Sequence, residues 1–167
     1  LDILVISPEP KKTVDFFTRL REAKRTLAKG PTKATIILKN NLQVDLRVLT
    51  EKEFGSALQY FTGNKQHNIE LRKIAIKKGY KLSEYGLFKK KKFVAGKTEE
   101  EIYQKLGMQT PPPELRTNTG EIEAALKHQL PKLVNYQDIH ADFQMHSTFS
   151  DGVNTIEEMA RTAKSLG

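Results

Sequence analysis

The sequence predicts an α+β fold in which a mixed or antiparallel sheet with helices on one face is followed by a smaller α/β unit. Three observations predict this class. Short apolar runs with the two-residue period of strands alternate with helical patterns, Gly and Pro mark the breaks between them, and residues 110–113 form a Pro-rich break. A chain of 167 residues is long enough for one good core or two small ones.

The first elements are a strand and a helix. Residues 1–6 form an apolar run typical of a buried strand, which the prolines of residues 7–10 end. A helix follows, which Thr13 can cap and the Gly30-Pro31 pair stops. Its apolar face is predicted to consist of Phe16, Leu20, Ala23 and Leu27.

A hairpin comes next. Residues 35–38 and 42–49 are predicted strands joined at residues 39–41, where Asn tolerates the left-handed conformation of a turn. Apolar residues alternate along the second strand, which leaves Asp45 and Arg47 together on the opposite face. Asp2 alternates with apolar neighbours on the first strand in the same way.

The second half begins with a predicted helix over residues 65–78, which ends at Gly79. Short strands are predicted at residues 81–85, 87–89 and 93–94. Thr98 and Glu101 then form a capping box that opens a helix ending at residues 106–107.

The Pro-rich break predicts a stiff, extended linker over residues 110–139, with a short helix that Asn118 and Glu121 can cap. Residues 140–167 then begin a new segment, in which Thr155 and Glu158 can form a capping box. This segment is too short to bury a core alone, so we expect it to be mobile or to borrow contacts from a neighbour.

Composition narrows the function class. A net charge of +8 with 38% hydrophobic residues describes a soluble basic protein whose expected large partner is nucleic acid. The chain has no Cys, which excludes disulfides and thiolate zinc sites. No apolar run approaches the length of a membrane span, and no signal-peptide pattern is present. These features predict no membrane partner and favour the cytoplasm, with association with the nucleoid.

A combination of motifs points to a family. The strand that carries Asp45 is followed by Tyr60-Phe61-Thr62-Gly63, by a helix with Asn68, and by Ser83-Glu84-Tyr85. This order resembles the palm and thumb of a bacterial, polymerase β-like family X DNA polymerase. The resemblance runs from residue 1 to about residue 106, and implies a palm at residues 1–58 and a thumb at residues 59–109.

The resemblance implies phosphoryl transfer assisted by two divalent cations, Mg²⁺ or Mn²⁺. Asp2 and Asp45 would be two of the three metal ligands, and Asp45 would also orient the primer 3′-hydroxyl. The family pattern is Gly-Asp-x-Asp, of which Leu1-Asp2 match only the last two positions. We therefore expect this chain by itself to bind the ions poorly and to be inactive. Local hydrogen bonding of Asp2, or pairing of Asp45 with Arg47, is the structural alternative.

The same resemblance implies that a dNTP and gapped or primer-template DNA are the partners. Tyr60 and Phe61 would pack under the deoxyribose, and the peptide after Gly63 would be strained, with a cis Gly63-Asn64 bond as one form of it. The residues predicted to bind the nucleotide are Tyr60, Phe61, Gly63, Lys65 and Asn68.

DNA contacts are predicted for Arg72 and for the run Lys89, Lys90, Lys91 and Lys92, which would grip phosphates without reading sequence. Lys65, Asn68 and Arg72 are expected on one polar stripe of their helix, which faces solvent or substrate. Arg47 and Glu84 form a predicted conformational switch of thumb closure. Ordinary solvated faces, or simple pairing of Arg47 with Glu84, are the alternatives.

Residues 141–152 resemble the first motif of a PHP (polymerase and histidinol phosphatase) domain. Such domains begin with His-x-His and carry an Asp five residues later, all ligating metals. Here Gln144 replaces the first His, followed by His146 and Asp151. His146 and Asp151 are candidate ligands for divalent metals in a whole PHP domain. Gln is a weaker ligand, which puts nuclease activity in doubt. Within this chain His146 is expected to be a lone, solvated side chain without metal partners.

The sequence thus predicts a segment of a DNA-directed DNA polymerase that adds deoxynucleotides to a primer 3′ end, in gap-filling repair. One alternative is another palm-type nucleotidyltransferase, although it gives no reason for the thumb motif. The other is a noncatalytic basic DNA-binding module. The first strand leaves a sheet edge through which the chain could form a dimer.

Overall fold

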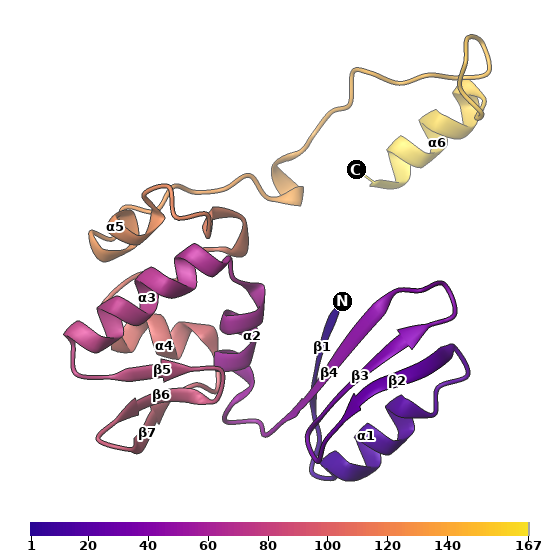
Figure 1. Cartoon of the computed structure of the whole chain (residues 1–167). Coiled ribbons are helices and arrows are strands. Elements are labelled where there is room, and N and C mark those ends of the chain that lie inside the picture. The colour runs from indigo at the N-terminus through magenta and orange to yellow at the C-terminus, as the bar shows by residue number, and fades with distance from the viewer. Residues whose placement is uncertain (167) are drawn as a thin grey trace. The chain divides into compact units, whose positions relative to one another are not determined.

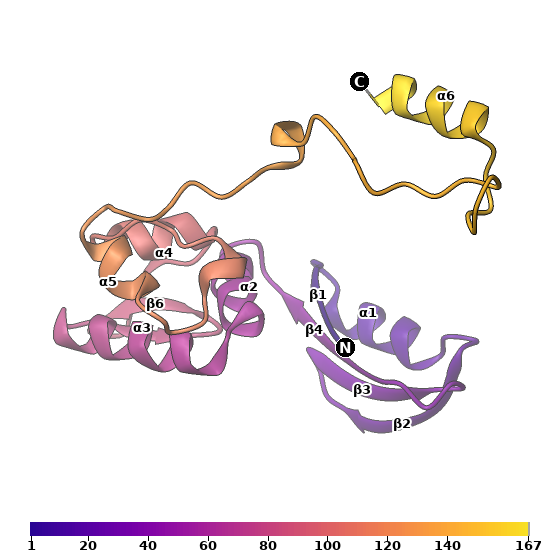
Figure 2. The ribbon, with the colours of Figure 1, turned by 90° about the horizontal axis from the view of Figure 1, so that it is seen from above.

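The computed structural model describes residues 1–166, which fall into two compact units: Leu1–Leu130 and the segment from Pro131 onward. Figure 1 shows their elements along the chain, and Figure 2 shows the same elements from above. No helix in the described part of the chain combines the length and apolar character needed to cross a bilayer.

The first unit begins with a four-stranded sheet in the order β1-β4-β3-β2. Its strands are β1 (Asp2–Ile6), β2 (Ala23–Lys29), β3 (Lys33–Leu38) and β4 (Gln43–Leu49). Strand β1 runs parallel to β4, whereas β4 with β3 and β3 with β2 are antiparallel. The β3–β4 hairpin forms as predicted, with Asn41 at a positive φ of 66° in its turn.

Helix α1 (Pro10–Thr18) covers one face of this sheet. It begins at Pro10, where the fixed φ of proline suits the first helical position, and not at a Thr13 cap. Val14 and Phe17 are the residues that it buries against the apolar positions of β3 and β4. Phe16, which the sequence pattern places on the buried face, is exposed.

The predicted continuation of this helix to residue 30 is wrong. Residues 23–29 form the edge strand β2, paired with β3 and interrupted by register shifts. The spacing of Ala23 and Leu27 fits a helix face, but the β3 edge offers main-chain partners to this segment, and tertiary pairing overrides local periodicity.

The remainder of the first unit contains a three-stranded antiparallel sheet in the order β5-β6-β7. Its elements are α2 (Phe54–Thr62), α3 (Lys65–Lys77), β5 (Lys81–Ser83), β6 (Gly86–Lys89), β7 (Lys92–Ala95) and α4 (Glu99–Lys105). The predicted α3, the three strands and α4 are confirmed, whereas the sequence pattern does not predict the helix at residues 54–62. Thr98 caps α4 by accepting a hydrogen bond from the Glu101 N–H.

The sequence predicts an extended linker over residues 110–139, but residues 110–130 are folded into the first unit. The short 3₁₀ helix η1 (Pro113–Leu115) and helix α5 (Glu121–Leu126) belong to the first unit. The first unit has two apolar cores, one under α1 and one between α3, α4 and the three-stranded sheet. Met108, Ile122 and Ala125 lie in the latter core together with Leu71 of α3. The prolines at 111–113 prevent a continuous helix, but the chain after them folds back so that α5 packs on α3.

The second unit contains the 3₁₀ helix η2 (Tyr136–Asp138) and helix α6 (Ile156–Leu166). None of residues 131–166 is buried, in agreement with the expectation that this segment lacks a core of its own. The predicted capping box is confirmed, because the Thr155 N–H donates to Glu158 Oε2 at 2.8 Å and the Glu158 N–H donates to Thr155 Oγ1 at 3.2 Å.

Gly55 is required where α2 meets the start of α4, since a Cβ at this position would overlap the backbone of Thr98. Alanine normally stabilises a helix relative to glycine. We expect Gly55→Ala to do the opposite, lowering the free energy of unfolding by about 1–3 kcal/mol because backbone has to move. Urea denaturation followed by circular dichroism measures the change.

Gly30→Ala is the matched control, because the space around Gly30 admits a methyl group and its neighbours lie at 3.6 Å or more. It should leave the urea midpoint nearly unchanged. A Gly55→Ala protein as stable as the Gly30→Ala protein would contradict the close packing of α2 on Thr98.

Candidate nucleotide and metal site

The structure brings two acidic side chains together on the first sheet. Asp2 of β1 and Asp45 of β4 are register partners on adjacent parallel strands. Register partners in a parallel pair point to the same face, which here is opposite to the face formed by Val44 and Leu46 under α1. The alternation in the sequence thus leads to the expected juxtaposition, and the role of both residues as metal ligands stays a prediction.

Asp45 is held as a carboxylate by two neighbours. The Thr35 hydroxyl donates to Oδ1 at 2.6 Å and the Gln43 amide donates to Oδ2 at 2.9 Å. The Thr35 bond, followed by the Gln43 bond, keeps the pKa of Asp45 below its ordinary value. Each carboxylate oxygen has a second lone pair, so both can still accept a further partner.

The donor set fits a hard divalent cation, because Mg²⁺ and Mn²⁺ prefer carboxylate oxygen. Asp2 is exposed, and Asp45 keeps lone pairs for a ligand bond. Within residues 1–166 no group of three or more His, Asp or Glu side chains is arranged to hold a metal ion. Two carboxylates are therefore the whole set that this part of the chain offers at the sheet.

An aromatic pair stands beside this sheet. The Arg47 guanidinium of β4 lies over the Phe61 ring at 5.3 Å from its centroid, and Phe61 meets Tyr60 edge to face at 5.1 Å. The expected pairing of Arg47 with Glu84 is absent from the ion pairs of residues 1–166, since the guanidinium stacks on Phe61 instead. The switch role of Arg47 and Glu84 stays a prediction.

The connection between α2 and α3 is fixed on both sides. The Gly63–Asn64 peptide bond is cis, as the family resemblance implied, and Gly63 has a φ of 73°. The Asn64 side chain caps α3 by accepting from the His67 N–H at 2.9 Å, while the Asn64 N–H donates to the Arg116 carbonyl at 3.1 Å. This segment places the start of α3 relative to the aromatic pair.

The expected polar stripe of α3 is only partly correct. Lys65 and Arg72 are not buried, but Asn68 keeps only 8% of its surface accessible. Its Oδ1 accepts from the Gln59 amide at 2.6 Å, and its Nδ2 donates to the Tyr60 carbonyl at 2.7 Å. The short amide side chain is turned toward α2 because α2 supplies a complementary donor and acceptor.

A buried polar cluster that no sequence pattern indicates joins α3 to α4 and α5. His67 is fully buried, with Nδ1 at 2.7 Å from Glu121 Oε1 and Nε2 at 2.9 Å from the Tyr103 hydroxyl. Burial would raise the pKa of Glu121, but hydrogen bonds from His67 and from backbone N–H groups hold it below its ordinary value. Glu121 is therefore an acceptor, and His67 donates from Nδ1.

The protonation of the cluster follows from this assignment. Burial lowers the pKa of His67, with Glu121 acting in the opposite sense, so His67 is neutral and its Nε2 is an acceptor. Burial raises the pKa of Tyr103 far above its ordinary value, so the phenol keeps its proton and donates it to His67 Nε2. No periodic pattern could reveal this cluster, because His67 and Glu121 are 54 positions apart.

Arg116 adds a buried charge to the same region. It is 2% exposed, its Nη1 donates to Glu99 Oε1 at 2.5 Å and its Nε donates to the Pro111 carbonyl at 2.9 Å. Its guanidinium also lies over the Tyr103 ring at 5.5 Å from the centroid. Pairing and hydrogen bonding together offset the loss of hydration of this cation.

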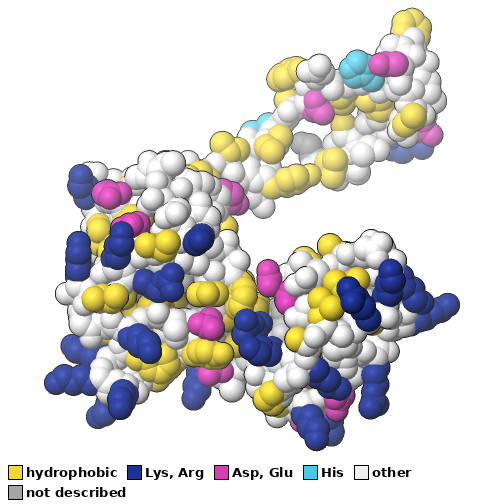
Figure 3. All heavy atoms as spheres, viewed as in Figure 1, with side chains coloured by type: hydrophobic (Ala, Val, Ile, Leu, Met, Phe, Trp, Pro, Cys, Tyr) yellow, Lys and Arg dark blue, Asp and Glu magenta, His cyan; other side chains and the backbone are white. Residues whose placement is uncertain are grey.

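The four predicted DNA-binding lysines lie at the β6–β7 turn. Lys90 and Lys91 are its central residues, with φ of 46° and 66°, and all of Lys89 to Lys92 are exposed. The Lys89 ammonium lies over the Tyr80 ring at 5.4 Å. Figure 3 shows further Lys and Arg side chains spread over the first unit in this view.

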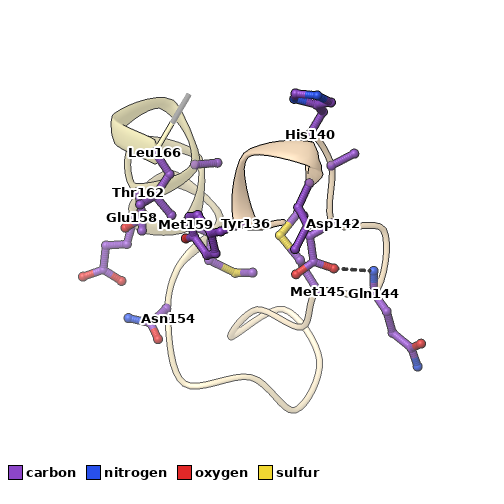
Figure 4. Close-up of a pocket in the computed structure, with 13 residues that line it drawn as sticks. Tyr136, His140, Asp142, Gln144, Met145, Asn154, Glu158, Met159, Thr162 and Leu166 are labelled. Atoms are coloured by element: carbon purple, nitrogen blue, oxygen red, sulfur yellow. Dashed lines mark hydrogen bonds between the residues drawn. The ribbon is translucent and has the colours of Figure 1, made fainter. Parts of the chain in front are cut away.

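In the second unit His146 is not a lone solvated side chain, which corrects the expectation. Its Nδ1 lies 2.5 Å from Asp151 Oδ1, and this bond lowers the pKa of Asp151. The same unit contains a hollow of about 770 Å³. Gln144, Met145 and Met159 are among its lining residues (Figure 4). Within it the Gln144 N–H donates to Asp142 Oδ1 at 3.1 Å.

Comparison with known proteins decides the family. The family model described as "DNA polymerase beta thumb" matches residues 57–117. Over its whole length the chain is 34% identical to "DNA polymerase/3'-5' exonuclease PolX" of Bacillus subtilis, of which it covers 30%. The chain belongs to the family X DNA polymerases. It spans about a third of the length of that Bacillus relative.

Other family X proteins and structures agree. The chain is 33% identical over 64% of its length to "Repair DNA polymerase X" of African swine fever virus (isolate Tick/South Africa/Pretoriuskop Pr4/1996), of which it covers 66%. A crystal structure of Leishmania infantum polymerase beta in a ternary gap complex superposes with a TM-score of 0.59 at 25% identity, covering 70% of this chain and 56% of the other. A ternary P/T complex of that polymerase gives 0.58 at 28% identity, covering 69% and 60%.

The family X assignment confirms the α+β class with a palm-like sheet followed by a thumb. The matched thumb region runs from α2 to just after η1, so it extends past the predicted limit at residue 109 and includes Arg116. Gln59, His67 and Tyr103 also fall inside it, whereas Glu121 lies just beyond it and belongs to α5.

Acid should destabilise the family X thumb through His67. Its pKa in the folded chain lies below the ordinary value of 6.5, so the unfolded chain takes up the proton first as pH falls. The free energy of unfolding should therefore decrease as pH drops below about 6.5. Glu121, whose pKa is also lowered, should add a further loss only below its ordinary value of 4.5.

Urea denaturation at pH 7.5, 6.0 and 5.0 measures this dependence. His67→Gln should lower stability at pH 7.5 by about 1–3 kcal/mol and flatten the change between pH 7.5 and 5.0. His146→Gln, at an exposed histidine, is the control and should keep the slope of the unchanged chain. If the free energy of unfolding of His67→Gln still decreased between pH 7.5 and 5.0 as it does in the unchanged chain, the pH dependence could not be assigned to His67.

Proposed function

We propose that the protein to which this chain belongs is a DNA-directed DNA polymerase that extends primer 3′ ends and fills short gaps during repair. The observation that carries the proposal is the pairing of Asp2 with Asp45 on adjacent strands, beside the Tyr60–Phe61 pair, in a chain of this family. Relatives named as repair and gap-bound polymerases support it.

The carboxylates would hold the catalytic cations. When bound, Mg²⁺ or Mn²⁺ lowers the charge that develops on the attacking and leaving oxygens during phosphoryl transfer. Asp45 is kept ionised by Thr35 and Gln43, so it is ready to accept a cation and to orient the primer 3′-hydroxyl. Asp2 completes the pair from the neighbouring strand.

The nucleotide would lie against the thumb. Tyr60 and Phe61 would support its deoxyribose, with Phe61 held in place by Arg47. Gly63 has no side chain to obstruct approach, and Lys65 is exposed at the start of α3 where it can meet a phosphate. Asn68 would address the minor-groove edge of the nascent base pair, whose acceptors are shared by all base pairs.

DNA would be held by charge. Arg72 would touch the minor-groove edge of the template. The exposed lysines of the β6–β7 turn would contact phosphates, so affinity should fall steeply with salt and depend little on sequence. Arg47 would exchange its contact with Phe61 for Glu84 or Asp45 as the thumb moves. With DNA as its substrate, the protein would act in the cytoplasm of a bacterial cell, at the nucleoid.

The second unit would be the first piece of a PHP domain. His146 and Asp151 already lie together, and in a complete domain they would join further ligands around divalent metals. Gln144 stands where a stronger imidazole ligand is expected, so we propose that any nuclease site here is weaker than the family pattern provides.

Asp45→Ala in the whole polymerase should abolish extension while leaving DNA binding intact. Losing the ligand should lower the rate of Mg²⁺-dependent extension on gapped DNA about a thousandfold, which corresponds to about 4 kcal/mol. Binding of the same DNA, followed by fluorescence anisotropy, should not weaken, because removal of an anion does not reduce attraction to phosphates.

Asp15→Ala is the matched control, since Asp15 is a carboxylate of α1 that pairs with Lys29 at 2.6 Å and has no proposed role in catalysis. It should extend the primer at the rate of the unchanged protein. Equal extension by the Asp45→Ala and Asp15→Ala proteins would end the assignment of Asp45, and DNA binding without any extension by the unchanged protein would favour a noncatalytic module.

A further inference from the structure

The carboxamide of Asn68 is held at both of its ends. Gln59 Nε2 donates to Oδ1 at 2.6 Å, and Nδ2 donates to the Tyr60 carbonyl at 2.7 Å. A primary amide has two N–H groups and two oxygen lone pairs, so one N–H and one lone pair of Asn68 remain for another partner. Only an N–H can bond to the minor-groove acceptors of a base pair.

Gln59 and the Tyr60 carbonyl together decide which way this amide faces. If the Asn68 amide turned over, its oxygen would meet the Tyr60 carbonyl and its nitrogen would meet the Gln59 nitrogen, leaving two buried mismatches. The Tyr60 carbonyl is part of the backbone and cannot change its character. Gln59, however, could reverse its own amide, so its orientation needs a constraint of its own.

Tyr103 supplies that constraint. Glu121 accepts from His67 Nδ1, which leaves His67 Nε2 to accept the Tyr103 hydroxyl proton. The Tyr103 oxygen is then left as an acceptor, and the nearby Gln59 side chain acts to lower the pKa of Tyr103 against the larger effect of burial. A contact that lowers the pKa of a phenol comes from a donor, so Gln59 turns its nitrogen toward Tyr103 as well as toward Asn68. Gln59 is therefore the donor at the head of both lines, one through Tyr103 and His67 to Glu121 and the other to Asn68 Oδ1.

We propose that Gln59 is a positioning residue for nucleotide recognition: it fixes the Asn68 amide so that a free N–H faces the minor-groove acceptor of the incoming base. Gln59 is 2% exposed and acts only through Asn68 and not on the substrate itself. The inference rests on the proposed polymerase function and deepens it, since it names the group that sets the direction of the contact.

Gln59→Leu in the whole polymerase tests the idea, because leucine fills similar space but cannot donate. The substrates are dGTP and 3-deaza-dGTP, which lacks the minor-groove nitrogen acceptor, in filling of a one-nucleotide gap opposite dC. The unchanged protein should show a KM about tenfold higher for the analogue, the effect of one lost hydrogen bond. Relative to the unchanged protein, Gln59→Leu should raise the KM for dGTP about tenfold and change kcat less than about threefold. The ratio of its KM values for the analogue and for dGTP should fall to about two or less.

Gln66→Leu is the matched control, since Gln66 is an exposed glutamine of α3 that precedes His67 in the chain. It should keep tenfold discrimination. Tyr103→Phe is the second variant, which keeps the ring but removes the hydroxyl that orients Gln59, and it should also lower discrimination. If thermal unfolding shows that Gln59→Leu does not fold, the discrimination measured for Tyr103→Phe decides the inference.

Two unfavourable outcomes are distinguishable. If the unchanged protein does not fill the gap at all, the proposed function fails and this inference with it. If it fills the gap and discriminates against the analogue, but Gln59→Leu and Tyr103→Phe discriminate equally well, then Asn68 is oriented without Gln59. That second result overturns the inference alone and leaves the polymerase proposal in place.

Discussion

The hydrogen bond from His67 to Glu121 is the interaction on which the thumb depends. Both groups are buried, and if either were absent the other would be dehydrated with no hydrogen bond to compensate for the lost water. The bond joins α3 to α5 and selects the tautomer of His67. That tautomer makes the Tyr103 hydroxyl on α4 the donor to His67 and leaves the Tyr103 oxygen as an acceptor toward Gln59 on α2. A segment beyond the proline-rich break thereby influences the face of α3 that we assign to the nucleotide.

The carboxylate pair is positioned by strand register and not by buried hydrogen bonds. Asp2 and Asp45 are placed by strand register and need little further support, because parallel pairing alone brings their side chains to one face. Thr35 and Gln43 keep Asp45 ionised but leave lone pairs for a cation. A metal site has to stay open to its ligand, whereas a structural cluster is stable only when every polar atom is paired.

Much of the architecture followed from local patterns. Alternation along residues 42–49 placed Asp45 on the polar face, and the cap of α4 and the end of α3 at Gly79 were visible as short motifs. Patterns failed where two structures suit the same spacing. Residues 23–29 have apolar residues at helical intervals, yet they pair with the β3 edge, and the helical stripe predicts an exposed Asn68 although Gln59 and Tyr60 draw it inward.

The sequence by itself determined the alternation of strands and helices, the two aspartates on their polar faces, the aromatic-Thr-Gly segment and the family that this combination indicates. Only the tertiary structure decided that residues 108–130 close the thumb core, that Arg47 stacks on Phe61, and that buried side chains of four helices pair as hydrogen-bond donors and acceptors. The reason is physical. Periodicity reports which face of an element is apolar, whereas partners many positions apart are chosen by packing and by the need of each buried polar atom for a complementary one.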